Sequence, residues 1–198
     1  MSKENEWVAS FVVELARRIQ VAARPGFLLK AEAFRKMPYA LEVLSYVENE
    51  PHEKHISRYE TDLLIYEQVE AVWYPRVVIE CKLGAVTTHD ALTYSAKAAT
   101  HKNVHPYLRY GILLGDWGKS PLPPRLVRHG AHFDFMASWQ GNEASLNEWE
   151  LFLSVLKSEI EASRRLQEIL TARTRAKAKY GMLHRKLVLH SIAEREPL

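Results

Sequence analysis

The chain has 198 residues, of which 47% are hydrophobic and 26% charged, and these proportions exclude a disordered or fibrous chain. Its formal net charge of +3 is too small to indicate a polyanionic partner by itself. A single cysteine, Cys81, excludes a disulfide framework and favours a reducing, cytoplasmic setting. The apolar runs are shorter than the roughly 20 residues that span a bilayer, and the amino terminus is polar, so we expect neither a membrane span nor a signal peptide.

The first part of the chain is predicted to contain two helices and a loop. Apolar residues recur at helical spacing over residues 5–24, and Pro25 and Gly26 end this amphipathic helix. We expect a second helix around Pro38 to Val47. The charged stretch that begins at Pro51 then predicts a loop.

Two apolar runs follow, rich in Ile, Val, Tyr and Trp, and they predict neighbouring β-strands. The runs extend from Tyr59 to Glu67 and from Val72 to Leu83, and a short turn between them would make a hairpin. After the second run, Thr87 and Asp90 have the spacing of a helix-capping box. We therefore expect a helix that begins there and continues through the alanine-rich stretch to His101.

The remaining elements complete an α/β pattern. Strands are predicted from Tyr107 to Gly115 and from His132 to Trp139, and a long helix from Leu146 through Leu170. This order predicts an α/β fold with a central mixed sheet flanked by helices. We divide it into a core over residues 1–141 and a carboxy-terminal helical extension over residues 142–198, packed on the core or projecting from it.

The predicted strand that ends at Leu83 carries a carboxylate and an ammonium among apolar residues. Side chains alternate across a strand, so Glu80 and Lys82 share one face with Val78, while Cys81 points to the other face, toward the core. An ion pair is a poor choice for stability alone, because desolvation opposes the Coulomb attraction. The pair therefore indicates chemistry; the alternative is a strand whose second face is wet.

Asp62 lies at the start of the preceding predicted strand, 18 positions before Glu80. If the two strands pair, the two carboxylates lie side by side at one end of the sheet. They repel each other unless a cation lies between them, and Mg²⁺ takes one or two protein carboxylates while it keeps several waters. Such an ion also binds substrate phosphates. We therefore expect a Mg²⁺ site, where Mn²⁺ can substitute, with Lys82 close enough to hold the metal-bound water or to neutralise charge on the phosphorus that the water attacks.

The pattern of Asp62, an apolar strand and then Glu80-Cys81-Lys82 resembles the PD-(D/E)XK nuclease superfamily, which includes type II restriction endonucleases. The resemblance covers roughly residues 8–140 and implies a restriction-endonuclease-like core. It also implies that Asp62 and Glu80 are metal ligands and that Lys82 positions the attacking water. The sequence departs from the pattern in one place, because Thr61 stands where a proline commonly precedes the aspartate.

Many members of this superfamily add an acid from the first helix. Glu14 flanks the apolar stripe of the predicted helix over residues 5–24 and is our candidate for that acid. Glu32 is its rival. The alternative for either residue is an exposed glutamate without a catalytic role.

Two groups of residues are candidates for contact with DNA. Tyr94 and Lys97 belong to a polar stripe on the helix after Lys82, together with Asp90 and His101. The second group lies in a basic segment near the carboxy terminus, where no Asp or Glu occurs from residue 169 to residue 193. Its members are Arg173, Arg175, Lys177 and Lys179. The alternative for this segment is an ordinary solvated helix face.

These observations lead to one functional hypothesis and two rivals. We expect a Mg²⁺-dependent endonuclease of restriction type that hydrolyses phosphodiester bonds of double-stranded DNA and that acts as a homodimer because two-fold symmetry suits duplex cleavage. The first rival keeps the fold without catalysis: a nucleic-acid-binding or assembly subunit with a nuclease-like fold, which binding of Mg²⁺ distinguishes from the enzyme. The second rival is an interaction protein whose long carboxy-terminal helices, with Trp149, Phe152 and Leu156, pair with another copy or another chain.

Overall fold

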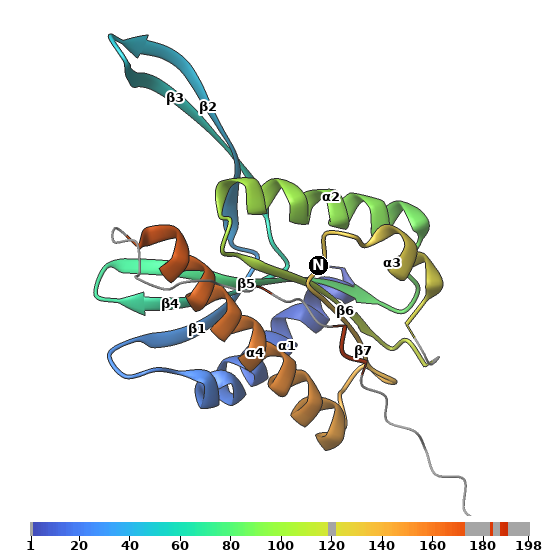
Figure 1. Cartoon of the computed structure of the whole chain (residues 1–198). Helices are drawn as coiled ribbons and strands as arrows, with labels where there is room; N and C mark the ends of the chain where they lie inside the picture. The colour runs from blue at the N-terminus through green and yellow to red at the C-terminus, as the bar shows by residue number, and fades with distance from the viewer. Residues whose placement is uncertain (1, 119–121, 173–182, 184–186, 190–198) are drawn as a thin grey trace, which may run out of the picture.

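The computed structural model describes residues 2–118, 122–172, 183 and 187–189. Its main feature is a mixed five-stranded sheet between two layers of helices (Figure 1). In spatial order the strands are β1 (Leu28–Ala33), β4 (Leu63–Val69), β5 (Val72–Leu83), β6 (Arg109–Gly115) and β7 (Phe135–Ser138). β4 is antiparallel to both β1 and β5, whereas β5, β6 and β7 are parallel to one another.

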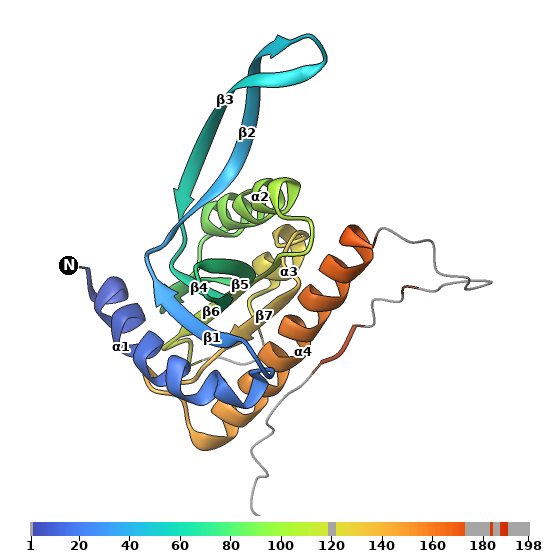
Figure 2. The same ribbon diagram turned by 90° about the vertical axis from the view of Figure 1, so that its left-hand side faces the viewer.

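Helices cover both faces of this sheet. They are α1 (Lys3–Arg18), the short 3₁₀ helix η1 (Ile19–Ala22), α2 (Thr88–Val104), α3 (Pro124–His129) and α4 (Leu146–Thr171). α1 and α4 pack on one face, and α2 and α3 on the other (Figures 1 and 2). Over the described ranges, no helix is both long and apolar enough to cross a membrane. The predicted α/β class, with a mixed sheet flanked by helices, is confirmed.

Local sequence signals place the helix starts. The capping box predicted at Thr87 and Asp90 is present and begins α2, and a second one, formed by Ser145 and Glu148, begins α4. The amphipathic helix predicted over residues 5–24 corresponds to α1 and η1. In each case side-chain oxygens or apolar spacing encode the element within a few residues, so the sequence alone reveals it.

α4 completes the core on the α1 side of the sheet. Its apolar stripe buries Trp149 and Phe152 against Phe11 of α1 and against Trp139, which follows β7. The ring centroids of Phe11 and Trp139 lie 5.0 Å apart in an edge-to-face arrangement. This helix, which begins just after the predicted boundary at residue 141, therefore shares one hydrophobic core with the sheet.

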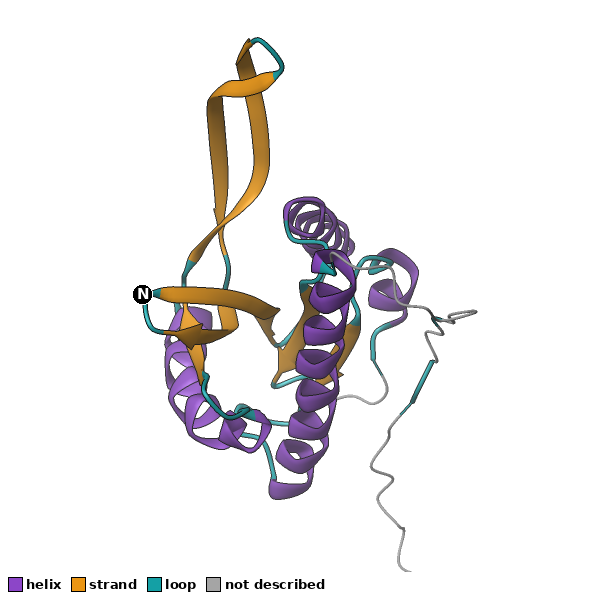
Figure 3. Cartoon of the chain, turned by 60° about the vertical axis from the view of Figure 1, so that its left-hand side comes forward, coloured by secondary structure: helices purple, strands orange, loops and turns teal. Residues whose placement is uncertain are grey.

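The segment between β1 and β4 differs from the prediction. The expected helix around Pro38 to Val47 is strand β2 (Lys36–Val47), and the expected loop at Pro51 belongs to strand β3 (Glu50–Glu60). Together they form a two-stranded antiparallel arm that projects beyond α2 (Figures 1, 2 and 3). Most of the arm is exposed on both faces, so its sequence lacks the alternation by which a half-buried strand is recognised.

The predicted hairpin is confirmed, with one change at its start. The run expected from Tyr59 splits, because Tyr59 belongs to β3 and β4 begins only at Leu63. Asp62 therefore occupies the break between the arm and the sheet. The register that pairs Leu63 with Ile79 places Asp62 beside Glu80, which sets the geometry of the candidate site.

At the opposite end of this hairpin, a buried carboxylate links β4 to α4. Glu67 is fully buried and accepts hydrogen bonds from Arg76 Nε at 2.8 Å and from Arg164 Nη2 at 2.7 Å. Arg24 Nε, from the segment after η1, lies 3.1 Å from the same carboxylate. The network joins three separate parts of the chain, and Arg76 is itself only 1% exposed.

Removing this carboxylate is expected to destabilise the fold strongly. Glu67→Ala leaves Arg76 buried without its partner, a change that typically lowers the free energy of unfolding by about 3 to 5 kcal/mol. Glu14→Ala is the matched control, because Glu14 pairs with arginines on an exposed surface, where solvent screens the ion pair and its loss changes stability little. Urea denaturation monitored by tryptophan fluorescence measures the free energy of unfolding of both variants. Equal losses of this free energy would contradict a stabilising role for the network.

Candidate active site

The candidate site lies at the carboxyl end of β5, on the side of the sheet that α2 covers. Val78 and Glu80 face α2, whereas Val77, Ile79 and Cys81 pack in the core beneath α1 and α4. The alternation predicted from the sequence is therefore correct. Burial raises the pKa of the Cys81 thiol well above its usual value, so this cysteine is a packing residue.

Asp62 and Glu80 lie side by side, as the pairing of β4 with β5 requires. Asp62 Oδ2 accepts a hydrogen bond from the backbone amide of Cys81 at 2.7 Å, which fixes the aspartate against β5. Burial raises the pKa of Asp62, although this hydrogen bond opposes the shift. A carboxylate just before β4 and another on β5 thus lie together in a largely buried corner of the sheet.

Glu80 is the most perturbed acid of the site. Its side chain is fully buried, and this burial, together with the neighbouring charge of Asp62, raises its pKa to about 7. Two donors act in the other direction: Lys97 Nζ lies 3.0 Å from the carboxylate, and the Tyr110 hydroxyl donates a hydrogen bond to it. The carboxyl group therefore changes its charge close to neutral pH.

A buried tyrosine and histidine support Glu80 from behind. The Tyr110 hydroxyl, which donates to Glu80, lies 3.3 Å from Nδ1 of His101. Burial lowers the pKa of His101 to about 4, so its ring is neutral at physiological pH. His101, which the sequence placed on an open polar stripe, is instead fully enclosed between Tyr110 and the base of the arm at Tyr59.

The two lysines of the site pair with different acids. Lys82 Nζ lies 3.3 Å from Glu4 Oε1 and 3.9 Å from Asp90 Oδ1, whereas Lys97 Nζ holds Glu80. Both amines lie near the ring of Tyr94: its centroid is 5.6 Å from Lys82 Nζ and 5.5 Å from Lys97 Nζ. The structure therefore brings Tyr94 and Lys97, our candidates for contact with DNA, close to Lys82 and Glu80.

The first-helix acid at this site is Glu4. It accepts a hydrogen bond from the Lys82 amine and another from the backbone amide of Leu83 at 3.1 Å. Glu14 lies ten residues further along α1, about 15 Å along the helix axis. It pairs with Arg17 and Arg18, which hold its pKa at about 2. The position expected for Glu14 is therefore wrong, because the first turn of α1, not its middle, reaches the end of β5.

Glu32 does not take this position either. It lies on β1, where it accepts hydrogen bonds from the Tyr66 hydroxyl and from Arg35. No sequence signal distinguishes Glu4, since an acid in the first turn of a helix is ordinary. The other candidates for DNA contact, Arg173, Arg175, Lys177 and Lys179, lie outside the described residues.

The carboxylate oxygens of the site fit a hard divalent cation that needs only one or two protein ligands. Within the part of the chain that the structure describes, no group of three or more His, Cys, Asp or Glu side chains is arranged to hold a metal ion. Mg²⁺ needs only one or two protein carboxylates, because water and substrate phosphate complete its shell. Asp62 and Glu80 supply those two, and their mutual repulsion is what such a cation would relieve.

Comparison with known proteins adds no family assignment. No model of a protein family matches the sequence, and no curated protein is significantly similar to it.

The raised pKa of Glu80 predicts a specific dependence of stability on pH. The folded state holds the Glu80 proton up to about pH 7, whereas the unfolded state releases it near 4.5. As the pH rises from 4.5 to 7 in the absence of metal, the free energy of unfolding therefore falls by up to about 3 kcal/mol. Glu80→Gln, which resembles the protonated acid, removes this contribution.

Urea denaturation of both proteins in chelator, from pH 5 to pH 8, measures this effect. We expect similar free energies of unfolding at pH 5 and a more stable Glu80→Gln protein at pH 8. Parallel pH profiles for the two proteins would show that Glu80 titrates normally.

Proposed function

We propose that this protein is a Mg²⁺-dependent endonuclease that hydrolyses DNA phosphodiester bonds, with a restriction-endonuclease-like core of the PD-(D/E)XK type. One observation carries the proposal. Asp62 and Glu80 converge from adjacent strands at the end of β5, and the amine of Lys82 lies at the same end. Further support comes from the resemblance of these residues to the PD-(D/E)XK pattern and from the mixed sheet that carries them.

Each residue of the site has a role in this reaction. Asp62 and Glu80 would hold Mg²⁺, or Mn²⁺ in its place. When bound, the ion lowers the pKa of a water and offsets the negative charge that develops on the attacked phosphate. Lys82 orients the attacking water, and Glu4 positions Lys82 through their 3.3 Å contact. Glu4 is therefore a positioning residue.

Lys97 adds a second source of positive charge at the phosphate. Its amine lies 3.0 Å from the Glu80 carboxylate, and α2 carries the side chain to the site. With Tyr94 beside it, Lys97 contacts the DNA backbone in this proposal. Arg173, Arg175, Lys177 and Lys179 extend the contact to more distant phosphates of a duplex.

Substitution of the three proposed catalytic residues tests the function. Asp62→Asn, Glu80→Gln and Lys82→Met should each lower cleavage of supercoiled plasmid in Mg²⁺ by at least about 100-fold, because each removes a metal ligand or the amine that orients the water. Glu14→Gln, exposed and far from the site, is the control and should cleave at the wild-type rate. Retained activity in any of the three would refute the assignment.

A specific observation favours a second candidate, a nucleic-acid-binding subunit without catalysis. The Glu80 carboxylate already accepts hydrogen bonds from two donors, Lys97 and Tyr110, so both are partners that a metal ion would have to displace or accompany. In this alternative Lys97 permanently takes the position of the cation.

Metal-induced stabilisation separates the two candidates. In the nuclease proposal, Mg²⁺ raises the melting temperature of the wild type at pH 8, since a ligand at 100 times its dissociation constant stabilises the fold by about 2.7 kcal/mol. The effect should shrink at pH 5, where Glu80 is protonated, and vanish in Glu80→Gln. No Mg²⁺ effect at pH 8 would favour the non-catalytic subunit.

A further inference from the structure

The arm formed by β2 and β3 has few contacts with the rest of the molecule. Its strands, 12 and 11 residues long, pair with each other and with no strand of the main sheet. Only the base of the arm rests on α2, and the remainder extends away from the domain (Figures 2 and 3). A hairpin of two strands is marginally stable in water unless a further surface covers it.

The outer part of the arm exposes large apolar side chains, and these are concentrated on β2. Tyr46 is 63% exposed and Leu44 61%. The other exposed apolar residues of this part of the arm are Leu41, Val43, Val47 and Ile56. Large exposed apolar side chains gathered on one projecting element mark an interaction site more often than apolar residues scattered singly over a surface.

The charge of the arm indicates what kind of partner fits it. Residues 41–56 contain four glutamates and a single lysine, Lys54, so this segment repels a nucleic acid backbone. The acids gather toward the tip, at Glu48, Glu50 and Glu53, whereas the base carries two cations, Lys36 and Arg58, and one acid, Glu60. The arm is therefore complementary in charge to another arm that runs in the opposite direction.

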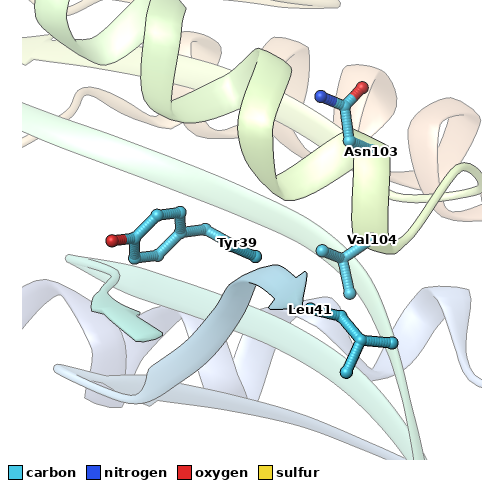
Figure 4. A pocket seen from close by; sticks show the side chains of 5 residues that line it. Tyr39, Leu41, Asn103 and Val104 are labelled. Carbon is cyan, nitrogen blue, oxygen red and sulfur yellow. The ribbon is translucent and has the colours of Figure 1, made fainter. Parts of the chain in front are cut away.

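A hollow at the base of the arm completes this complementarity. It has a volume of about 450 Å³ and lies between β2 and the last turn of α2 (Figure 4). Its lining residues are Tyr39, Ala40, Leu41, Asn103 and Val104. In an antiparallel crossing of two arms, the tip of one arm reaches the base of the other, where this hollow of mixed polar and apolar lining lies.

We propose that two copies of this chain associate through their arms, which cross antiparallel about a two-fold axis, with Tyr46 and Val47 of each copy seated in the hollow beside Val104 of the other. The contact is isologous, as a two-fold dimer requires. The 23 residues of the two strands match the 20 to 30 residues per partner of a stable interface of standard size. The inference does not depend on the proposed nuclease activity.

Sedimentation equilibrium of the full chain, in chelator and without DNA, tests the association. We expect twice the chain mass of 22.9 kDa. Leu44→Ser combined with Tyr46→Ser should weaken dimerisation at least about 100-fold, because two large apolar contacts are lost from each copy. Val13→Ser combined with Val21→Ser, equally exposed on the other side of the domain, is the matched control and should leave the mass unchanged.

A disulfide trap tests the antiparallel arrangement. Tyr46→Cys combined with Val104→Cys should give an oxidised dimer on a non-reducing gel, whereas either substitution alone should not. A bond within one chain is excluded, because Tyr46 lies about 17 Å along β2 from Leu41 at the hollow. Cross-linking by Tyr46→Cys alone would mean that tip meets tip, which overturns the arrangement.

DNA binding provides the remaining outcome. Fluorescence anisotropy with a labelled duplex in chelator compares the wild type with the Leu44→Ser, Tyr46→Ser protein. A monomeric wild type whose DNA affinity falls in this variant would identify the arm as a nucleic-acid contact and overturn the proposal. Cleavage does not enter any of these measurements, so failure of the dimer and failure of the nuclease assignment remain distinguishable.

Discussion

The candidate site depends on the burial of one carboxylate, Glu80, near the carboxyl end of the central strand β5. Removing a charge from water costs several kcal/mol unless partners compensate, and here Asp62 makes the cost larger. The fold supplies Tyr110, from the neighbouring strand, and Lys97, from the helix above. Even with these donors the pKa of Glu80 stays near 7, so the corner remains electrostatically incomplete. Perturbed acids of this kind concentrate at functional sites.

The two ends of the β4–β5 hairpin treat buried acids in opposite ways. At one end Glu67 has three arginines around it, and the result is a tie between the sheet and α4. At the other end, about 17 Å along β4, two carboxylates share the amine of Lys97. The first end has more positive than negative charge, whereas the second has two carboxylates for the amine of Lys97. The same hairpin therefore holds one buried acid that arginines surround and another whose pKa is raised by burial and by the neighbouring charge of Asp62.

The sequence predicted the hairpin, the α2 capping box and the neighbouring positions of Asp62 and Glu80 correctly, because each depends on local spacing. It failed at the arm, where strands exposed on both faces carry no burial pattern and Pro38 to Val47 resembled a helix. It also failed at the first-helix acid. Glu14 had the appropriate position on the helix stripe, but Glu4 has the appropriate position along the helix axis, which only the packing of α1 against β5 fixes.

The sequence by itself therefore determined which residues alternate on β5, that a short turn joins β4 to β5, and that Asp62 and Glu80 would lie side by side at one end of the sheet. These features follow from the two-residue period of a strand and from side-chain capping, which act over a few residues. Only the tertiary structure decided the partners of those charges: Glu4 for Lys82, Lys97 and Tyr110 for Glu80. Such partners come from elements 17 to 78 positions apart in the chain, and no local pattern specifies how distant elements pack.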